Sequence, residues 1–218
     1  RIVLSSENLS SADNNVIRNN KFFENGKSGS GAALAIGQGM GNLVYNNKVF
    51  GNSAGISLAH QASGTKVYNN TVYGNSTFGV YIEPANSDGS DAAVINNILY
   101  QNGTNIEEPK RAALLLNNLE TDPSFVDPVN EDFRLDTTSA AIDAGVALAE
   151  VQDDIDGIPR PQGVAYDIGA YEFVGSFIPS VKSPKLTADS SASTNAAPPA
   201  PAPASSWCSR ACCCSRGW

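Results

Sequence analysis

The chain has 218 residues, of which 17% are charged, and its formal net charge at pH 7 is −8. The charged fraction is below the roughly 25% typical of soluble domains, and no apolar run approaches the roughly 18 residues of a membrane-spanning helix. Residues 107–172 hold 15 acidic and 4 basic residues, whereas residues 1–106 hold 6 of each. A chain of this charge lacks the basic surface of a general nucleic-acid-binding protein, and its acidic segment suits calcium.

The first half of the chain consists of repeats. Asn-Asn pairs recur at intervals of 27, 23, 27 and 21 residues and begin at Asn19, Asn46, Asn69, Asn96 and Asn117. An apolar residue stands two positions before each pair, and in the first four units another stands two positions after it and a third Asn follows. Columns that agree over four or five units predict a repeat architecture.

Each unit is predicted to contain three short β-strands: one near a Gly, one before the Asn pair and one after it. The stretches Gly55–Leu58 and Gly79–Ile82 alternate apolar with small or polar residues, as strands with one buried face do. A unit of three strands cannot bury its own apolar face, so the units must stack. Asn tolerates left-handed backbone angles, and Asn amides stacked about 4.8 Å apart can hydrogen-bond from coil to coil. The repeated asparagines are therefore predicted to be structural.

This pattern resembles the right-handed parallel β-helix of the pectate-lyase type. The stretches DPSFVDPVNEDFRLDTTSAAIDAG (122–145) and DIDGIPRPQGVAYDIGAYEF (154–173) closely resemble the closing segment of bacterial secreted β-helix proteins of the choice-of-anchor Q domain type. The resemblance implies an all-β solenoid of about five coils in residues 1–120, a closing segment in residues 121–173, and an extracellular or cell-surface location. Because such β-helices usually begin with a cap and have more coils, we expect further turns before Arg1 in the whole protein.

Residues 174–218 are rich in Ser, Ala and Pro and are predicted to be a disordered linker that ends in the cysteine-rich stretch WCSRACCCSRGW. A zinc site is not expected there, because no second ligand pair stands at zinc spacing. Two interpretations stay open: a genuine short tail, or the frameshifted remnant of a C-terminal anchor helix, which would be the only membrane connection.

The candidate functional site follows from an alignment of the Gly-led strands. This alignment predicts two outward columns, one of Ser57, Tyr81 and Asn105 and one of Ala59, Glu83 and Glu107. In that register Glu83 and Glu107 lie on adjacent coils, about 5 Å apart. Two carboxylates at that distance disfavour joint ionisation unless a cation sits between them.

The resemblance to β-helix polysaccharide lyases assigns roles to this face. It implies that Glu83 and Glu107 hold Ca²⁺ and that Lys110 and Arg111 act as base and as neutraliser of a uronate carboxylate during proton abstraction. Tyr81 and Asn105 would contact sugar, as would His60, for which a role in the turn is the alternative. No Lys/Arg pair stands in the same column, and two solvated glutamates are the structural alternative.

Other residues carry weaker predictions. Lys21 and Lys48 stack and either attract an acidic polymer or blunt a strand column. Arg160 is predicted to pair with Asp167 or Glu172. An aromatic column is either an outward sugar-stacking platform or, as we favour, part of the core; it consists of Phe23, Phe50, Tyr73 and Tyr100.

The leading hypothesis is a secreted or cell-surface monomer that binds extracellular polysaccharide, with acidic polymers among the candidates, and that is not catalytic in this chain. The first alternative is a calcium-dependent lyase that cleaves uronate polymers by β-elimination. The second is a structural stalk or adhesin.

Overall fold

The computed structural model describes residues 2–4, 12–26, 31–83, 91–108 and 113–175. All of them belong to one compact unit, Arg1–Phe177. The predicted linker and cysteine-rich tail therefore lie almost entirely outside the described residues. Within the described residues no helix is long and apolar enough to span a bilayer.

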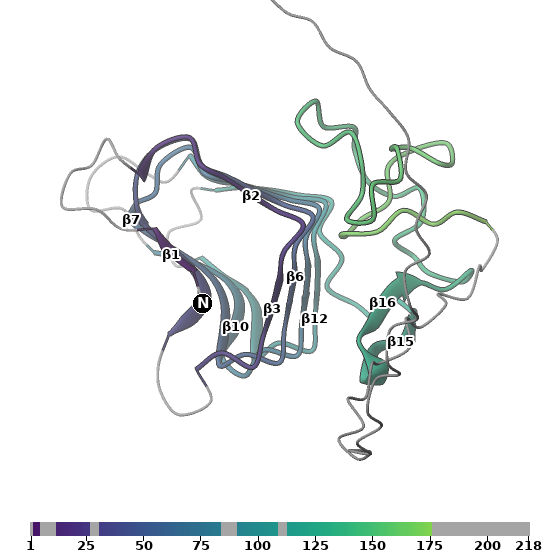
Figure 1. Cartoon of the computed structure of the whole chain (residues 1–218), viewed down its shortest axis with the longest axis horizontal. Coiled ribbons are helices and arrows are strands. Elements are labelled where there is room, and N and C mark those ends of the chain that lie inside the picture. The colour runs from purple at the N-terminus through teal and green to yellow at the C-terminus, as the bar shows by residue number, and fades with distance from the viewer. Residues whose placement is uncertain (1, 5–11, 27–30, 84–90, 109–112, 176–218) are drawn as a thin grey trace, which may run out of the picture. The chain divides into compact units, whose positions relative to one another are not determined.

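The repeat region folds into three parallel sheets, and each turn of the chain adds one strand to each sheet (Figure 1). Sheet A contains β1 (Ile2–Leu4), β4 (Ala32–Gln38), β7 (Ala54–Gln61), β10 (Phe78–Ile82) and β13 (Thr104–Glu107). Sheet B contains β2 (Val16–Arg18), β5 (Leu43–Tyr45), β8 (Lys66–Tyr68), β11 (Ala93–Ile95) and β14 (Leu114–Leu116). Sheet C contains β3 (Lys21–Phe23), β6 (Lys48–Phe50), β9 (Thr71–Tyr73) and β12 (Ile98–Tyr100). The described residues thus form four complete turns and part of a fifth, which confirms the predicted all-β parallel solenoid.

The Asn pairs form the corner between sheets B and C. The first Asn of each pair has a positive φ, between 46° and 58°, as a sharp turn by a non-glycine residue requires. The second Asn forms a ladder: the side-chain oxygen of Asn47 accepts hydrogen bonds from the backbone N–H and the amide of Asn20, at 3.0 and 3.1 Å. The amide of Asn47 in turn donates to Asn70, at 2.9 Å. These contacts explain why the pairs recur.

The core of the solenoid is filled by the apolar columns that flank the Asn pairs. Val44, Val67 and Val94 on one side, and Val49 and Val72 on the other, have no exposed surface. Burial of such columns is the main favourable contribution to the fold. In the last turn the equivalent residue, Leu115, is 42% exposed, because β14 is the last strand of sheet B.

Residues 121–173, the closing segment, pack against the outward faces of sheets B and C. The segment begins with an antiparallel pair, β15 (Phe125–Asp127) and β16 (Asp132–Leu135), joined by the 3₁₀ turn η2 (Pro128–Asn130), and continues as irregular backbone. On sheet B, Val151 packs against Tyr45 and Tyr68. On sheet C, Phe133 packs against Phe50, with ring centroids 4.9 Å apart.

The aromatic column corrects one prediction. It points away from the solenoid interior, because Phe22 and Val49 of the same strands occupy the core. The column is not an open platform either, since Phe50 is only 9% exposed under the closing segment. The prediction that this column lies in the solenoid core was therefore wrong: the rings point outward, Phe50 is buried between the solenoid and the closing segment, and Phe23 is 44% exposed.

Candidate functional site

The outward side of sheet A is the candidate functional face, because its middle strands carry partly exposed side chains. One column runs across four neighbouring strands: Ala35 pairs with Ser57, Ser57 with Tyr81, and Tyr81 with Glu107. The first three residues are half-buried and Glu107 is exposed. The column therefore offers a hydroxyl, a phenol and a carboxylate in a row, with a spacing of about 4.8 Å set by the strands.

The register of this column differs from the prediction at its last step. Glu107 lies beside Tyr81, and not beside Glu83. Glu83 follows Ile82, which pairs with Leu58, so Glu83 lies level with Ala59 as predicted, and its N–H donates to the carbonyl oxygen of Leu58 at 2.8 Å. The two glutamates thus do not form the predicted adjacent pair.

The cause of the shift is the position of glycine in the turn. The alignment matched Gly103 with Gly79, but the strand pairing places Phe78 beside Thr104, so Gly79 lies beside Asn105. A Cβ at Gly103 would lie 2.4 Å from the carbonyl oxygen of Thr77, which places Gly103 one position before the strand. Glycine is needed here because two backbone segments approach closely. It does not occupy the same position in every strand, as the alignment assumed.

The side chain of Asn105, in β13, is hydrogen-bonded to neighbouring parts of the same chain. Its side-chain oxygen accepts a hydrogen bond from the amide of Asn102 at 3.1 Å, and its own amide donates to the carbonyl oxygen of Glu120 at 3.5 Å. The predicted column of Ser57, Tyr81 and Asn105 is therefore wrong in its third member. Sequence reasoning found the first two.

Aromatic surface is the other feature of this face. The rings of Phe78 and Tyr81 lie 5.4 Å apart with an interplanar angle of 37°, and both residues are half-buried. Such a pair presents apolar ring surface together with one hydroxyl group.

Three predicted site residues are not described at the side-chain level. Lys110 and Arg111 lie outside the described residues, and so does the side chain of His60, although its backbone belongs to β7. Over the described part of the chain, no three His, Cys, Asp or Glu side chains gather as a metal site. Calcium binding by Glu83 and Glu107 thus stays a prediction, but it is no longer supported by the two glutamates lying side by side.

The stacked lysines hold the closing segment. The Nζ atom of Lys21 lies 2.5 Å from a carboxylate oxygen of Glu131, and that of Lys48 donates to the hydroxyl of Tyr171 at 2.7 Å. Burial, together with neighbouring Lys21, lowers the pKa of Lys48. Sequence reasoning missed this role because the partners are more than 100 residues away.

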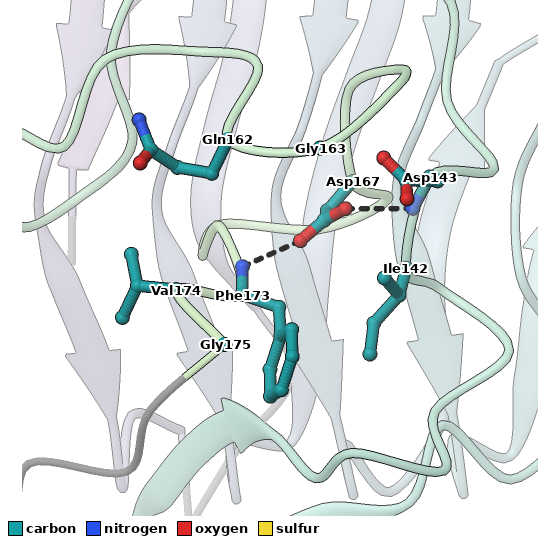
Figure 2. A pocket seen from close by; sticks show the side chains of 8 residues that line it. All are labelled: Ile142, Asp143, Gln162, Gly163, Asp167, Phe173, Val174 and Gly175. Atoms are coloured by element: carbon teal, nitrogen blue, oxygen red, sulfur yellow. Dashed lines mark hydrogen bonds between the residues drawn. The ribbon is translucent and has the colours of Figure 1, made fainter.

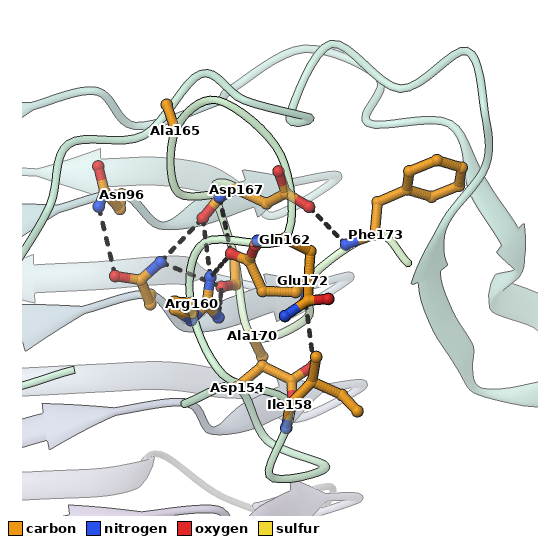
Figure 3. A network of polar contacts seen from close by, with 12 residues as sticks. Asn96, Asp154, Ile158, Arg160, Gln162, Ala165, Asp167, Ala170, Glu172 and Phe173 are labelled. Atoms are coloured by element: carbon orange, nitrogen blue, oxygen red, sulfur yellow. Dashed lines mark hydrogen bonds and ion pairs between the residues drawn. The ribbon is translucent and has the colours of Figure 1, made fainter. Parts of the chain in front are cut away.

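Arg160 is the centre of a buried polar network that joins the closing segment to the solenoid (Figure 3). Its guanidinium lies 2.6 Å from Glu172, and both side chains are completely buried. It also donates to the backbone oxygens of Asp167 and Gly169, at 3.0 and 2.9 Å. The predicted structural pairing of Arg160 is confirmed for Glu172, whereas Asp167 contributes its backbone carbonyl.

The aspartates of the loop 153–157 also serve the fold. One carboxylate oxygen of Asp154 accepts the backbone N–H groups of Asp156 and Ile158, each at 2.8 Å, and the other accepts that of Glu172 at 3.0 Å. Asp154 is 1% exposed. Its carboxylate is therefore occupied in tying this turn to the end of the closing segment.

A hollow of about 330 Å³ lies within the closing segment, with Asp143, Asp167 and Phe173 among its lining residues (Figure 2). The carboxylate of Asp167 joins two separate parts of the irregular backbone. It accepts a hydrogen bond from the N–H of Asp143 at 2.7 Å and one from the N–H of Phe173 at 2.5 Å. Burial raises the pKa of Asp167 to about 6, against the opposing effect of these two hydrogen bonds.

A second hollow, of about 540 Å³, opens at the last turn between Ile106, Glu108, Leu114, Leu115 and Glu120. All three leucines of β14 are exposed, by 41% to 57%. This hollow is the uncovered end of the core, and its shape follows from the incomplete fifth turn.

The sheets, the Asn ladders and the open face together define a parallel β-solenoid whose exposed sheet carries the candidate site. The family model described as right handed beta helix region matches residues 5–121. This span is more than half of the 218 residues, so the chain belongs to the right-handed β-helix family. A comparison with curated proteins gives no match.

Proposed function

We propose that the protein is a monomeric, secreted or cell-surface β-helix protein of the choice-of-anchor Q type, which binds extracellular polysaccharide on the outward face of sheet A without cleaving it. One observation carries the proposal. The closing segment packs on sheets B and C, whereas sheet A presents the partly exposed column of Ser57, Tyr81 and Glu107.

The chemistry of this column suits a sugar chain. The rings of Phe78 and Tyr81 can pack against the apolar face of a sugar ring. The carboxylate of Glu107 and the hydroxyl groups of Ser57 and Tyr81 are acceptors or donors for sugar hydroxyls. The column runs along the stacking direction of the coils, so a linear polymer can contact several turns at once.

Catalysis is not favoured by the described geometry. β-Elimination needs a base and a group that neutralises the uronate carboxylate. The described column holds one carboxylate, and the glutamate pair on which the calcium prediction depended is not adjacent. We therefore expect no calcium-dependent rise in the ultraviolet absorbance of uronate polymers incubated with the protein.

The test is affinity electrophoresis of the full chain in gels that contain soluble polysaccharides, with a Tyr81→Ala variant. We expect Tyr81→Ala to weaken binding about fivefold, because removing an aromatic contact costs on the order of 1 kcal/mol. Phe23→Ala is the matched control, since Phe23 is an exposed aromatic residue of sheet C, 44% exposed. Retardation by no polymer, or an equal loss in both variants, would show that sheet A is not the binding face.

A further inference from the structure

We propose that the polysaccharide bound by sheet A is uncharged and rich in hydroxyl groups, and is not a uronate polymer. This inference rests on the proposed function and names the chemical class of its ligand. It departs from the acidic polymers that the sequence resemblance favours.

Sheet A differs from the other two parallel sheets in its composition. Its five strands contain no Lys and no Arg. The basic residues of the described strands belong instead to sheets B and C and to β16. The exposed column contains one carboxyl side chain, that of Glu107, and Glu83 follows β10 on the same sheet.

The basic side chains of the described residues already have partners within the protein. Each Lys and Arg in the described residues contacts a carboxylate or a phenol: Arg18 with Asp153, Lys21 with Glu131, Lys48 with Tyr171, Lys66 with Glu150, Arg134 with Asp132, and Arg160 with Glu172. All six partners belong to the closing segment; four of them contact a Lys or Arg of the solenoid, and two contact an Arg of the segment itself. A sugar carboxylate would have to compete with them.

Electrostatics then separates the two ligand classes. A uronate chain laid along the column would bring a negative charge beside the carboxylate of Glu107, and like charges at such distances repel. A neutral sugar instead donates its hydroxyl protons to the same carboxylate, and hydrogen bonds to ionised acceptors are the stronger ones. The rings of Phe78 and Tyr81 can pack equally well against a neutral sugar and against a uronate. The difference in affinity between the two kinds of polymer should therefore come from charge.

The experiment compares polymers that share a backbone and differ in charge. The full chain is run in affinity gels that contain highly methyl-esterified pectin or polygalacturonate, and hydroxyethyl cellulose or carboxymethyl cellulose, each with calcium and with EDTA. We expect retardation by at least one neutral member, at least tenfold weaker retardation by its acidic counterpart, and little change when NaCl is raised from 50 to 500 mM.

Two variants sharpen the result. Glu107→Gln keeps an acceptor but removes the charge, so it should weaken neutral binding about threefold and narrow the difference between the neutral and acidic members. The double variant Lys110→Gln/Arg111→Gln removes the two bases that follow β13 and should leave neutral binding unchanged.

The outcomes are distinguishable. Preference for the acidic members, with or without calcium, or loss of binding in the Lys110/Arg111 variant, would overturn the inference while leaving polysaccharide binding intact. Retardation by no polymer, or binding that Tyr81→Ala does not affect, would instead overturn the proposed function itself.

Discussion

The buried ion pair of Arg160 and Glu172 gives the sharpest test of how the closing segment is held. The change is Arg160→Met, which keeps most of the side-chain volume and removes the charge. It leaves the carboxylate of Glu172 in the interior, 0% exposed, with only the backbone N–H groups of Asp167 and Gln162 at 2.8 and 3.0 Å. Removing one partner of a buried pair costs roughly 3–5 kcal/mol.

The assay is urea unfolding followed by circular dichroism. For a domain of this size the urea dependence is about 2 kcal/mol per molar, so the midpoint should fall by about 1.5–2.5 M. Arg134→Met is the matched control: Arg134 pairs with Asp132 in the same segment, but the two side chains are 27% and 26% exposed. Its loss should cost about 1 kcal/mol or less.

The reasoning would be refuted if Arg160→Met and Arg134→Met lowered the midpoint equally. The double variant Arg160→Met/Glu172→Leu adds a second check. Replacing both partners by apolar groups removes the unpaired charge, so this variant should be more stable than Arg160→Met alone. If the double variant is instead less stable than Arg160→Met, the loss of stability comes mainly from the backbone carbonyls of Asp167 and Gly169, which lose their donor, and not from the unpaired charge of Glu172.

Three further predictions concern the ladder, the pH dependence and the packing of sheet A. Asn70→Asp should lower the free energy of unfolding by about 3 kcal/mol, because a fully buried amide within hydrogen-bonding distance of three acceptor oxygens would be replaced by a group that cannot donate; Asn19→Asp, at an exposed corner position, should be within about 0.5 kcal/mol of wild type in the same urea titration. Because the pKa of Asp167 is raised to about 6 in the folded protein, the folded state binds more protons, so its stability should decrease as pH rises from about 4 to about 6. The decrease due to this group should be as much as about 3 kcal/mol and absent in Asp167→Asn, and an unchanged pH profile in that variant would contradict the assignment. Gly55→Ala should cost roughly 1–3 kcal/mol, since a Cβ there would lie 2.1 Å from the carbonyl oxygen of Gly79; thermal melting should show a smaller loss for Gly157→Ala, which has open space but a φ of +83°.

Much of the solenoid was predictable because its stabilising contacts repeat. An inward Val two positions before an Asn pair meets the same residue in the next turn, as Val44 meets Val67 and Val67 meets Val94. Such contacts leave a periodic trace in the sequence. The corner conformation was predictable for the same reason, since one left-handed residue is needed at each turn.

The candidate site was only partly predictable. Tyr81 beside Ser57 followed from the matching Gly-led strands. Glu107 beside Tyr81 did not, because one glycine, Gly103, lies outside the strand register that the alignment assumed. A register error of two residues keeps the inward–outward alternation correct, which is why the face was right and the neighbours were wrong.

The coil, its corners and its apolar interior could be predicted because each is set by residues that lie one turn apart. Which outer face stays exposed among the described residues depends instead on contacts between distant segments. Lys48 contacts Tyr171, 123 residues later, and Phe50 contacts Phe133. Because each of these contacts occurs only once, no repeat in the sequence predicts it. They cover part of sheets B and C with the closing segment, whereas the column of Tyr81 and Glu107 on sheet A stays partly exposed, and this column is the surface that we propose for ligand binding.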